Sequence, residues 1–270
     1  MNKGVVILCM RKPSYACAAF NLALSIKFHS PDIHITLLSD GVHNKAFSAS
    51  HFSVFDWIKE IKEPTVTAAK LSLDNYSPYK HSLYIDADSI CLQPIEPIFD
   101  ELKNCYFSSI VPDNYTSWTD ETTFKDFFKS SPAQNINSSF IYWEEMGNDI
   151  FNVAKTFYEC GFDKSKLTDK WGTSTHLPDE LFFNGAIAYL GTTAKTEFPV
   201  MFFDDKKAKI SPTEIAEQYY FMTFYGNNSN TRLSYREWYD REMFRICSIK
   251  GIAHRFKIGD IMAHKLVNEK

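Results

Sequence analysis

The chain has 270 residues, of which 44% are apolar and 16% aromatic. A chain of this length and composition can bury a large core, which excludes intrinsic disorder as its main state and fits one large domain. Its 29 basic and 33 acidic residues give a net charge of −4. So mild a balance excludes a polybasic nucleic-acid binder of the histone kind.

Cysteine spacing and apolar runs bear on the compartment. The six cysteines lie at positions 9, 17, 91, 105, 160 and 247. None forms a C-x-x-C pair, which excludes zinc-ribbon and thioredoxin-like sites. Scattered thiols are typical of a reduced cytosolic protein, so we expect a cytoplasmic location. No stretch approaches the roughly 18 apolar residues that a membrane span needs, so we expect no membrane-spanning segment.

The first half of the chain alternates between strand and helix patterns. Continuous apolar runs predict buried strands, and apolar residues at helical spacing predict helices between them. Alternation of this kind predicts an α/β fold, with a mainly parallel sheet flanked by helices and ligands beyond the carboxyl ends of its strands. The expected strands are 4–10, 33–38 and 82–86, the expected helices are 13–29 and 66–73, and 54–61 is ambiguous.

The second half is less regular, with loops expected over 112–120 and 168–178. We expect a strand over 138–143, a helix over 144–160 capped by Gly161, a helix opening at 178–180 and a short strand at 251–253. Without a repeat or linker, the prediction is a single domain over 1–270. Its expected parts are a nucleotide-binding half (1–100), a sugar and acceptor half (101–231) and a basic segment (232–270) with nine basic and five acidic residues.

The most informative motif is an acidic pair after the strand at 82–86. Asp86 and Asp88 are two residues apart, and strand geometry would send both side chains to the same side. Two adjacent carboxylates repel each other unless a cation lies between them. Hard oxygen ligands favour Mg²⁺ or Mn²⁺, which also accept phosphates as ligands. The alternative interpretation is a solvated turn.

With this motif in place, the chain resembles the nucleotide-sugar glycosyltransferases of the GT-A fold, particularly the glycogenin-like and galactosyltransferase-like group called family 8. The matching segments occur in the order of the family and span roughly residues 4–260. They are Lys70 before Leu71-Ser72-Leu73, Tyr84-Ile85-Asp86-Ala87-Asp88, Asn137-Ser138-Ser139-Phe140-Ile141-Tyr142, Pro178-Asp179-Glu180-Leu181-Phe182-Phe183-Asn184, and His254-Arg255-Phe256-Lys257.

The resemblance implies a Rossmann-like GT-A fold, a UDP-sugar donor and a role for each matching residue. Metal ligands would be Asp86, Asp88 and His254, holding Mn²⁺ or Mg²⁺. Catalytic residues would be Asp179, Glu180 and Asn137. Donor-binding residues would be Met10, Arg11 and Tyr15 at the nucleobase, Lys70, Asp86, Ala87 and Asp88 along the nucleotide sugar, Ser138 and Ser139 at the sugar, and Lys257 at the pyrophosphate.

The chain departs from the family pattern at three places. Ser139 stands where the family has glycine, and Asp179-Glu180 stands in place of Asp-Gln-Asp. The spacing from His254 to Lys257 is shorter than in the family, and His264 is a competing ligand candidate. The sequence leaves open whether an acid at 179–180 stabilises the sugar cation of a retaining enzyme or acts as the general base of an inverting one.

We therefore predict a metal-dependent glycosyltransferase that moves glucose or galactose from a UDP-sugar to a hydroxyl, with retention as the resemblance to the family implies. The acceptor would be a glycan, a protein or a small molecule. One alternative acceptor is a modified base in DNA, suggested by the basic segment and by Tyr115 and Trp118. A sugar-phosphate nucleotidyltransferase is the alternative of another class, although residues 9–13 lack the glycines of its phosphate loop.

Overall fold

The computed structural model describes residues 1–111, 118–144, 148–168, 176–194, 198–203, 210–224, 233–251 and 256–257. The chain divides into two compact units, each built from separate stretches of sequence. Unit 1 comprises 1–2, 62–83 and 102–197, and unit 2 comprises 3–61, 84–101 and 198–270. The predicted functional division at residues 100 and 231 stays a prediction.

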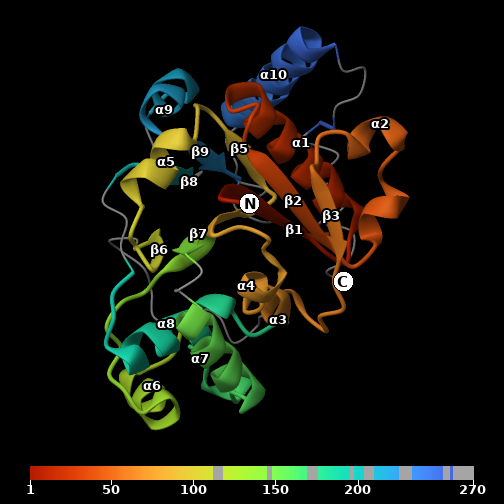
Figure 1. Cartoon of the computed structure of the whole chain (residues 1–270). Coiled ribbons are helices and arrows are strands. Elements are labelled where there is room, and N and C mark those ends of the chain that lie inside the picture. The colour runs from red at the N-terminus through yellow and green to blue at the C-terminus, as the bar shows by residue number, and fades with distance from the viewer. Residues whose placement is uncertain are drawn as a thin grey trace. The chain divides into compact units, whose positions relative to one another are not determined.

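Unit 2 contains the first strands and helices of the chain. The apolar run of the first strand is buried along nearly its whole length, which explains why it forms an inner strand. The helix that follows begins at Pro13, where proline is tolerated because the first helical N–H has no partner in the helix. These elements are β1 (Lys3–Cys9), α1 (Pro13–His29), β2 (His34–Ser39), the 3-10 helix η1 (Val42–Lys45), α2 (Ala49–Phe52) and β3 (Trp57–Glu60) (Figure 1).

The rest of unit 2 includes a second, small sheet. Its strands have three residues each, too short for a periodic pattern to reveal them in the sequence. The elements are β5 (Ser89–Cys91), α5 (Glu96–Glu101), β8 (Met201–Phe203), α9 (Pro212–Gln218), β9 (Phe221–Thr223) and α10 (Leu233–Lys250). In this sheet β9 is central, antiparallel to β5 and parallel to β8. In the same unit, α10 packs against α1.

Unit 1 is mainly helical around two antiparallel strands. Its elements are α3 (Val66–Lys70), α4 (Leu73–Tyr76), β6 (Phe107–Ile110), α6 (Glu121–Phe128), β7 (Asn137–Glu144), α7 (Asn148–Glu159), the 3-10 helix η3 (Lys164–Lys166) and α8 (Asp179–Leu190). Gly185 lets α8 approach α6, because a Cβ there would lie 2.2 Å from the ring of Phe128. The strand β4 (His81–Ile85) spans the boundary between the two units.

The main sheet has the strand order β3-β2-β1-β4-β7-β6 within the described residues. Parallel pairing joins β1 to β2 and β2 to β3, and antiparallel pairing joins β6 to β7. The order reverses direction after β1, because β2 and β3 lie on one side of it and β4 on the other. In α/β sheets such a reversal marks the place where ligands bind. The predicted α/β fold with a mainly parallel sheet is confirmed.

Several predicted elements are confirmed and others differ. The helix at 13–29 has the predicted bounds, and the ambiguous segment 54–61 contains β3. The predicted helix at 66–73 is two short helices, α3 and α4. The predicted helix at 144–160 begins only at Asn148, because β7 continues to Glu144. Gly251 follows α10 with a φ of 66°, and the rest of the strand predicted at 251–253 lies outside the described residues.

Membrane insertion by a helix finds no support in the described residues. None of the helices there combines the length and the apolar character needed to cross a bilayer.

Candidate functional site

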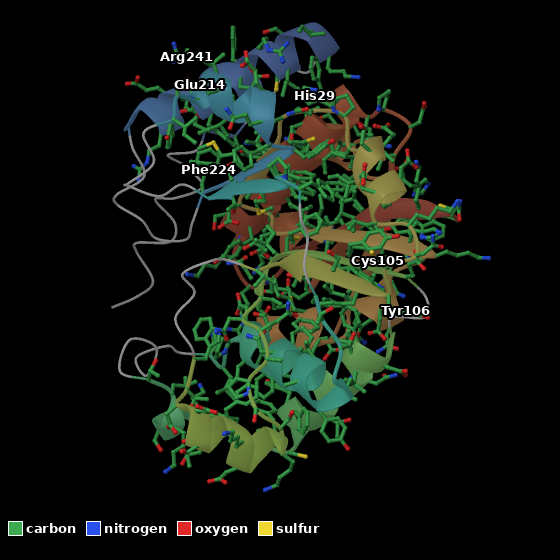
Figure 2. The ribbon with its side chains drawn as sticks, turned by 90° about the vertical axis from the view of Figure 1, so that its left-hand side faces the viewer. His29, Cys105, Tyr106, Glu214, Phe224 and Arg241 are labelled. Atoms are coloured by element: carbon green, nitrogen blue, oxygen red, sulfur yellow. The ribbon has the colours of Figure 1, made fainter. Side chains whose placement is uncertain are left out.

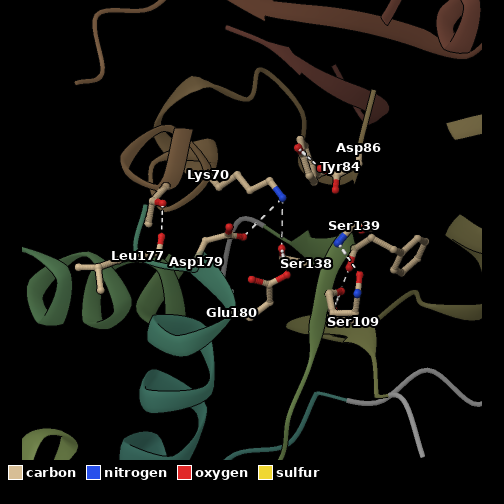
Figure 3. Close-up of polar contacts among 12 residues, drawn as sticks. Lys70, Tyr84, Asp86, Ser109, Ser138, Ser139, Leu177, Asp179 and Glu180 are labelled. Atoms are coloured by element: carbon tan, nitrogen blue, oxygen red, sulfur yellow. Dashed lines mark hydrogen bonds and ion pairs between the residues drawn. The ribbon is translucent and has the colours of Figure 1, made fainter. Parts of the chain in front are cut away.

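A buried lysine and two acids form the centre of the candidate site in unit 1 (Figure 3). Lys70 ends α3 and is only 7% exposed. Its Nζ donates a hydrogen bond of 3.2 Å to Ser138 Oγ and lies 3.5 Å from Asp179 Oδ2. The same Ser138 hydroxyl donates to Glu180 Oε1 at 2.9 Å. One hydroxyl therefore links the cation to a carboxylate from another helix.

Helix starts and caps place these three side chains. Thr65 caps α3, with its hydroxyl accepting from the N–H of Ala68 at 2.9 Å. Thr67 Oγ1 then donates to the carbonyl of Leu177 at 2.5 Å, which ties α3 to the segment before α8. Because Pro178 precedes α8, the two acids occupy its first turn, where negative charge is favoured by the helix dipole.

The surroundings of Glu180 shift its pKa in both directions, with a net increase. Loss of water and the neighbouring charge of Asp179 raise the pKa of Glu180 to about 7, while Lys70 and the Ser138 hydroxyl act to lower it. Asp179 Oδ2 is buried and has no hydrogen-bond partner among the described residues. Its contact with Lys70 is an ion pair of 3.5 Å, which is longer than a hydrogen bond between charged groups. Glu180 is thus a carboxyl group that can gain or lose a proton near neutral pH.

The Asn137-Ser138-Ser139 segment lies at an irregularity of the sheet. Ile110 faces Asn137, but the preceding residue, Ser109, faces Ile141. Residues 138–140 therefore have no opposite residues on β6, and we call them the β7 bulge. Bulges re-aim side chains and are common beside active sites. Here the bulge carries Ser138 between Lys70 and Glu180.

The buried amides near the bulge serve the backbone. Asn137 is 2% exposed, and its Oδ1 accepts from the N–H of Ser139 at 2.9 Å within the bulge. Asn184 of α8 accepts from the N–H of Ile136 at 2.8 Å, while its Nδ2 is buried without a hydrogen-bond partner among the described residues. These bonds hold the start of β7 against α8. The predicted catalytic role of Asn137 stays a prediction.

In unit 2 the acidic pair forms a turn and not the end of a strand. β4 ends at Ile85, and the N–H of Ser89 donates to the carbonyl of Asp86 at 3.2 Å. The strand-period reason for expecting Asp86 and Asp88 on one side is therefore wrong, because a turn with an i to i+3 bond does not continue the pleat. Both aspartates are partly exposed, and Ala87 between them is buried.

The turn is supported by side chains from two further elements. Tyr84 donates from its hydroxyl to Asp86 Oδ1 at 2.5 Å, and Thr223 Oγ1 lies 3.4 Å from Asp88 Oδ1. The N–H of Phe224, just beyond β9 in Figure 2, donates to the backbone carbonyl of Asp88 at 2.9 Å. Two partly exposed carboxylates on a braced turn are the hard oxygen donors that fit a divalent cation.

The turn after β1 has an unusual backbone. Arg11 has a φ of +71°, and the N–H of Lys12 donates to the carbonyl of Met10 at 2.9 Å. Asp40, after β2, holds this tight turn by accepting from the N–H of Arg11 at 2.8 Å. A side-chain-bearing residue at positive φ costs about 1–3 kcal/mol, and such strain is concentrated at functional sites.

The predicted nucleobase residues differ in exposure. Arg11 is exposed, Tyr15 is half-buried, and Met10 is only 4% exposed. Lys257 is exposed. The nucleotide-binding roles of these four residues stay predictions.

The predicted third metal ligand, His254, lies outside the described residues, as do its competitor His264 and the aromatic candidate Tyr115. Among the residues that the structure does describe, no group of three His, Cys, Asp or Glu side chains is arranged to hold a metal ion. The carboxylates of Asp86 and Asp88 are therefore the described part of the predicted metal site.

The structure brings six predicted site residues together in unit 1, around the β7 bulge and the start of α8: Lys70, Asn137, Ser138, Ser139, Asp179 and Glu180. The other described candidates belong to unit 2. Sequence reasoning missed Ser109, Asp40, Thr223 and Asn21. The last is fully buried and donates to Tyr239 Oη at 2.9 Å and to the carbonyl of Phe256 at 2.7 Å, next to Lys257. An asparagine among the apolar residues of the helical pattern at 13–29 was the available signal for Asn21.

The raised pKa of Glu180 predicts a pH-dependent stability. Because the folded state holds the Glu180 proton to a higher pH than the unfolded chain does, stability falls as the pH rises from about 4.5 to about 7. Glu180→Gln removes this titration. We expect the difference in melting temperature between this variant and the unchanged chain to favour the variant more at pH 8 than at pH 4.5. Each kcal/mol of stability that the variant gains corresponds to roughly 2–4 °C.

Thermal unfolding of both proteins at a series of pH values measures this difference. The exposed Glu217 of α9 supplies the control, Glu217→Gln, for the loss of a surface carboxylate. A melting-temperature difference for Glu180→Gln that does not change with pH would contradict the prediction.

The sheet order, the acidic turn after β4 and the lysine–acid cluster define a class of protein: the chain has the GT-A fold of nucleotide-sugar glycosyltransferases. One solved structure of similar fold is the galactosyltransferase LgtC in complex with donor and acceptor sugar analogs. It has a TM-score of 0.57 and 12% sequence identity, and the match covers 97% of this chain and 100% of that one. The resemblance predicted from sequence is confirmed at the level of fold.

Two further solved structures are similar. An active-site glutamine-to-glutamate variant of LgtC has a TM-score of 0.57 and 13% identity, covering 96% of this chain and 99% of that one. The bifunctional glycosyltransferase WbbM in its apo form has a TM-score of 0.56 and 10% identity, covering 91% of this chain and 51% of that one. No protein-family model and no curated protein sequence matches the chain.

Proposed function

We propose that the chain is a metal-dependent glycosyltransferase that moves a hexose from UDP-glucose or UDP-galactose to a hydroxyl acceptor with retention of configuration. The observation that carries the proposal is the buried lysine of unit 1, held by Ser138 and paired with an acid of α8. The fold shared with LgtC, whose complex holds donor and acceptor sugar analogs, gives this cluster its context.

A buried lysine–acid cluster does little for stability. Taking charged groups out of water costs several kcal/mol for each ion, and well-packed apolar residues would often serve the fold as well or better. Groups with perturbed pKa values are instead concentrated at functional sites. Glu180 fits that description because its pKa is raised, and the buried side chains of Lys70 and Asp179 lie beside it.

Asp86 and Asp88 would hold the divalent cation, with His254 as the proposed third ligand. Bound there, Mn²⁺ or Mg²⁺ would supply positive charge to the diphosphate that leaves. An imidazole ligand would favour Mn²⁺. The braced turn supports the assignment, because Tyr84 and Thr223 orient the two carboxylates from separate elements.

The remaining chemistry falls to the side chains of the cluster. When the bond between the anomeric carbon and the phosphate oxygen breaks, negative charge grows on the diphosphate and positive charge on the sugar ring. Lys70 would stabilise the first, and Asp179 the second. On a retaining course the departing phosphate accepts the proton of the acceptor hydroxyl. Glu180, which can change protonation near neutral pH, would orient the acceptor hydroxyl on the face of the sugar that the phosphate leaves.

The two alternative functions gain no support from the described residues. Residues 10–12 form a tight turn around Arg11, and residues 9–13 lack the glycines of a nucleotidyltransferase phosphate loop. A DNA acceptor rested on the basic segment and on aromatic residues near 115. On α10, however, Arg245 is hydrogen-bonded to Glu242 at 3.0 and 3.1 Å. This charge is thus partly neutralised, and a DNA acceptor stays a prediction.

Slow hydrolysis of the donor tests the proposed function without knowledge of the acceptor. The protein is incubated with UDP-glucose, UDP-galactose, a GDP-sugar and a CMP-sugar in the presence of Mn²⁺, and release of the nucleoside diphosphate or monophosphate is measured. We expect release from a UDP-sugar that stops when a chelator is added. Absence of both hydrolysis and binding for every donor would contradict the proposal. Once an acceptor is found, the anomeric configuration of the product decides between retention and inversion.

A further inference from the structure

The β7 bulge is closed by a residue that the proposed function does not use. Ser109 of β6 is fully buried, and its hydroxyl lies 2.8 Å from the carbonyl oxygens of both Asn137 and Phe140. Asn137 immediately precedes the bulge and Phe140 is its last residue, so a single hydroxyl contacts the backbone at both ends of the bulge. Figure 3 shows Ser109 beneath the bulge, on the strand adjacent to Ser138 and Ser139.

Residues within a bulge lose their ladder hydrogen bonds to the bulged partner, here β6, so on that side their position depends on other contacts. Asn137 supplies one such contact from the same strand, because its side-chain oxygen accepts a hydrogen bond from the N–H of Ser139. Ser109 supplies the other from the neighbouring strand. The register places Ser109 opposite Ile141, the first residue after the bulge, and Ile110 opposite Asn137, the last residue before it. Ser109 therefore stands where the two strands rejoin.

The side chain carried by the bulge is the hydroxyl between Lys70 and Glu180. Ser138 accepts from the lysine at 3.2 Å and donates to the carboxyl at 2.9 Å. Both distances depend on where the bulge backbone lies, because a serine side chain is too short to compensate for a displaced Cα. The charged groups that face Glu180 in unit 1 are Asp179 on its own helix and Lys70 on α3.

We infer that Ser109 is a positioning residue for the candidate active site: by holding the two ends of the β7 bulge, it keeps the Ser138 hydroxyl between Lys70 and Glu180. The inference rests on the proposed function only for its effect on catalysis. The positioning itself is a property of unit 1 and is measurable in the absence of donor or metal.

The effect on Glu180 has a defined sign. The Ser138 hydroxyl donates to Glu180 and so favours the charged carboxylate. Ser109→Ala displaces that donor, and the pKa of Glu180 rises further. Stability falls from the pKa of the unfolded chain up to that of folded Glu180. The upper end of this range then moves upward by about half to one pH unit, because one pH unit corresponds to 1.36 kcal/mol and a hydrogen bond to a charged group contributes about that much.

The experiment follows the melting temperature from pH 5 to pH 9 for the unchanged chain, Ser109→Ala, Ser138→Ala and the double variant. We expect the upper end of the pH range over which stability falls to move upward equally in both single variants. The double variant should show no additional shift, because both changes remove the same interaction between Ser138 and Glu180. Ser108→Ala, one residue earlier on β6 and also buried, is the matched control and leaves the midpoint unchanged. Equal pH profiles for Ser109→Ala and the unchanged chain, or additive shifts in the double variant, would overturn the inference.

Donor hydrolysis separates this inference from the proposed function. If the chain hydrolyses a UDP-sugar, the rate is measured as a function of pH. The pH at which the rate changes on the alkaline side should move upward in Ser109→Ala, as the melting profile does, and stay in place in Ser108→Ala. If the unchanged chain neither binds nor hydrolyses any nucleotide sugar, the proposed function fails, while the melting profiles still decide whether Ser109 positions Ser138. Should Ser109→Ala fold poorly, Ser109→Thr, which keeps the hydroxyl, is expected to restore the original midpoint.

Discussion

Replacing Asp88 with asparagine is expected to lower Mn²⁺-dependent hydrolysis of a UDP-sugar at least about 100-fold and to leave the melting temperature unchanged or raised. Loss of a residue that merely supports a metal ligand costs about 10–100-fold, so loss of a ligand should cost at least as much. The fold is spared for two reasons. Asparagine keeps the oxygen that faces Thr223, and the bond from Phe224 goes to the backbone carbonyl of Asp88. Repulsion from Asp86 also falls.

Asp100→Asn is the matched control for this prediction. Asp100 lies exposed on α5 in the same unit, and its replacement removes the same charge without touching the turn. Hydrolysis rates for the three proteins are measured over a range of Mn²⁺ concentrations, together with thermal unfolding without metal. Full turnover in Asp88→Asn at ordinary Mn²⁺ concentrations would show that the metal assignment is wrong.

Lys70→Met should affect both stability and catalysis. Removing one member of a buried ion pair leaves a buried carboxylate without compensation, at a cost of about 3–5 kcal/mol. Lys70 also acts to lower the pKa of Glu180, so its loss raises that pKa further. We expect destabilisation that is greater at pH 8 than at pH 5. Hydrolysis should fall about 100- to 1,000-fold, as when one stabilising donor at a transition state is removed.

A second substitution separates the two effects of Lys70. Lys70→Met combined with Asp179→Asn replaces the ion pair by neutral groups of similar size, so most of the melting temperature should return. Hydrolysis should not return, because the cation for the diphosphate is still missing and the carboxylate proposed to stabilise the sugar cation is also replaced. Recovery of both properties in the double variant would show that Lys70 serves only to neutralise Asp179.

The fold could largely be predicted because its signals are local. The apolar run of β1, the helical spacing of 13–29 and the glycine at 161 depend on neighbouring residues alone, and the structure confirms them. The small sheet formed by β5, β8 and β9 could not be predicted. Its strands have three residues each, and the pairing of β5 with β9 joins segments more than a hundred residues apart in sequence.

The candidate site was predictable as a set of residue types, but less so as geometry. Asp86 and Asp88 were expected to continue a strand, and they occupy a turn because the chain must leave β4 to form β5. Ser109 carries no sequence signal, since a serine in a short strand is ordinary. Its importance arises only from the register of β6 against β7.

By itself, the sequence determined the alternation of strands and helices, the class of fold and the residues with the chemistry to bind a metal and a diphosphate. These follow from periodicity and from side-chain types, which are properties of short stretches of chain. The tertiary structure alone decided that Lys70, Ser138 and two acids of α8 contact one another, and that burial raises the pKa of Glu180. Long-range packing sets distances and removes water, and both act on a residue through neighbours that are remote in sequence.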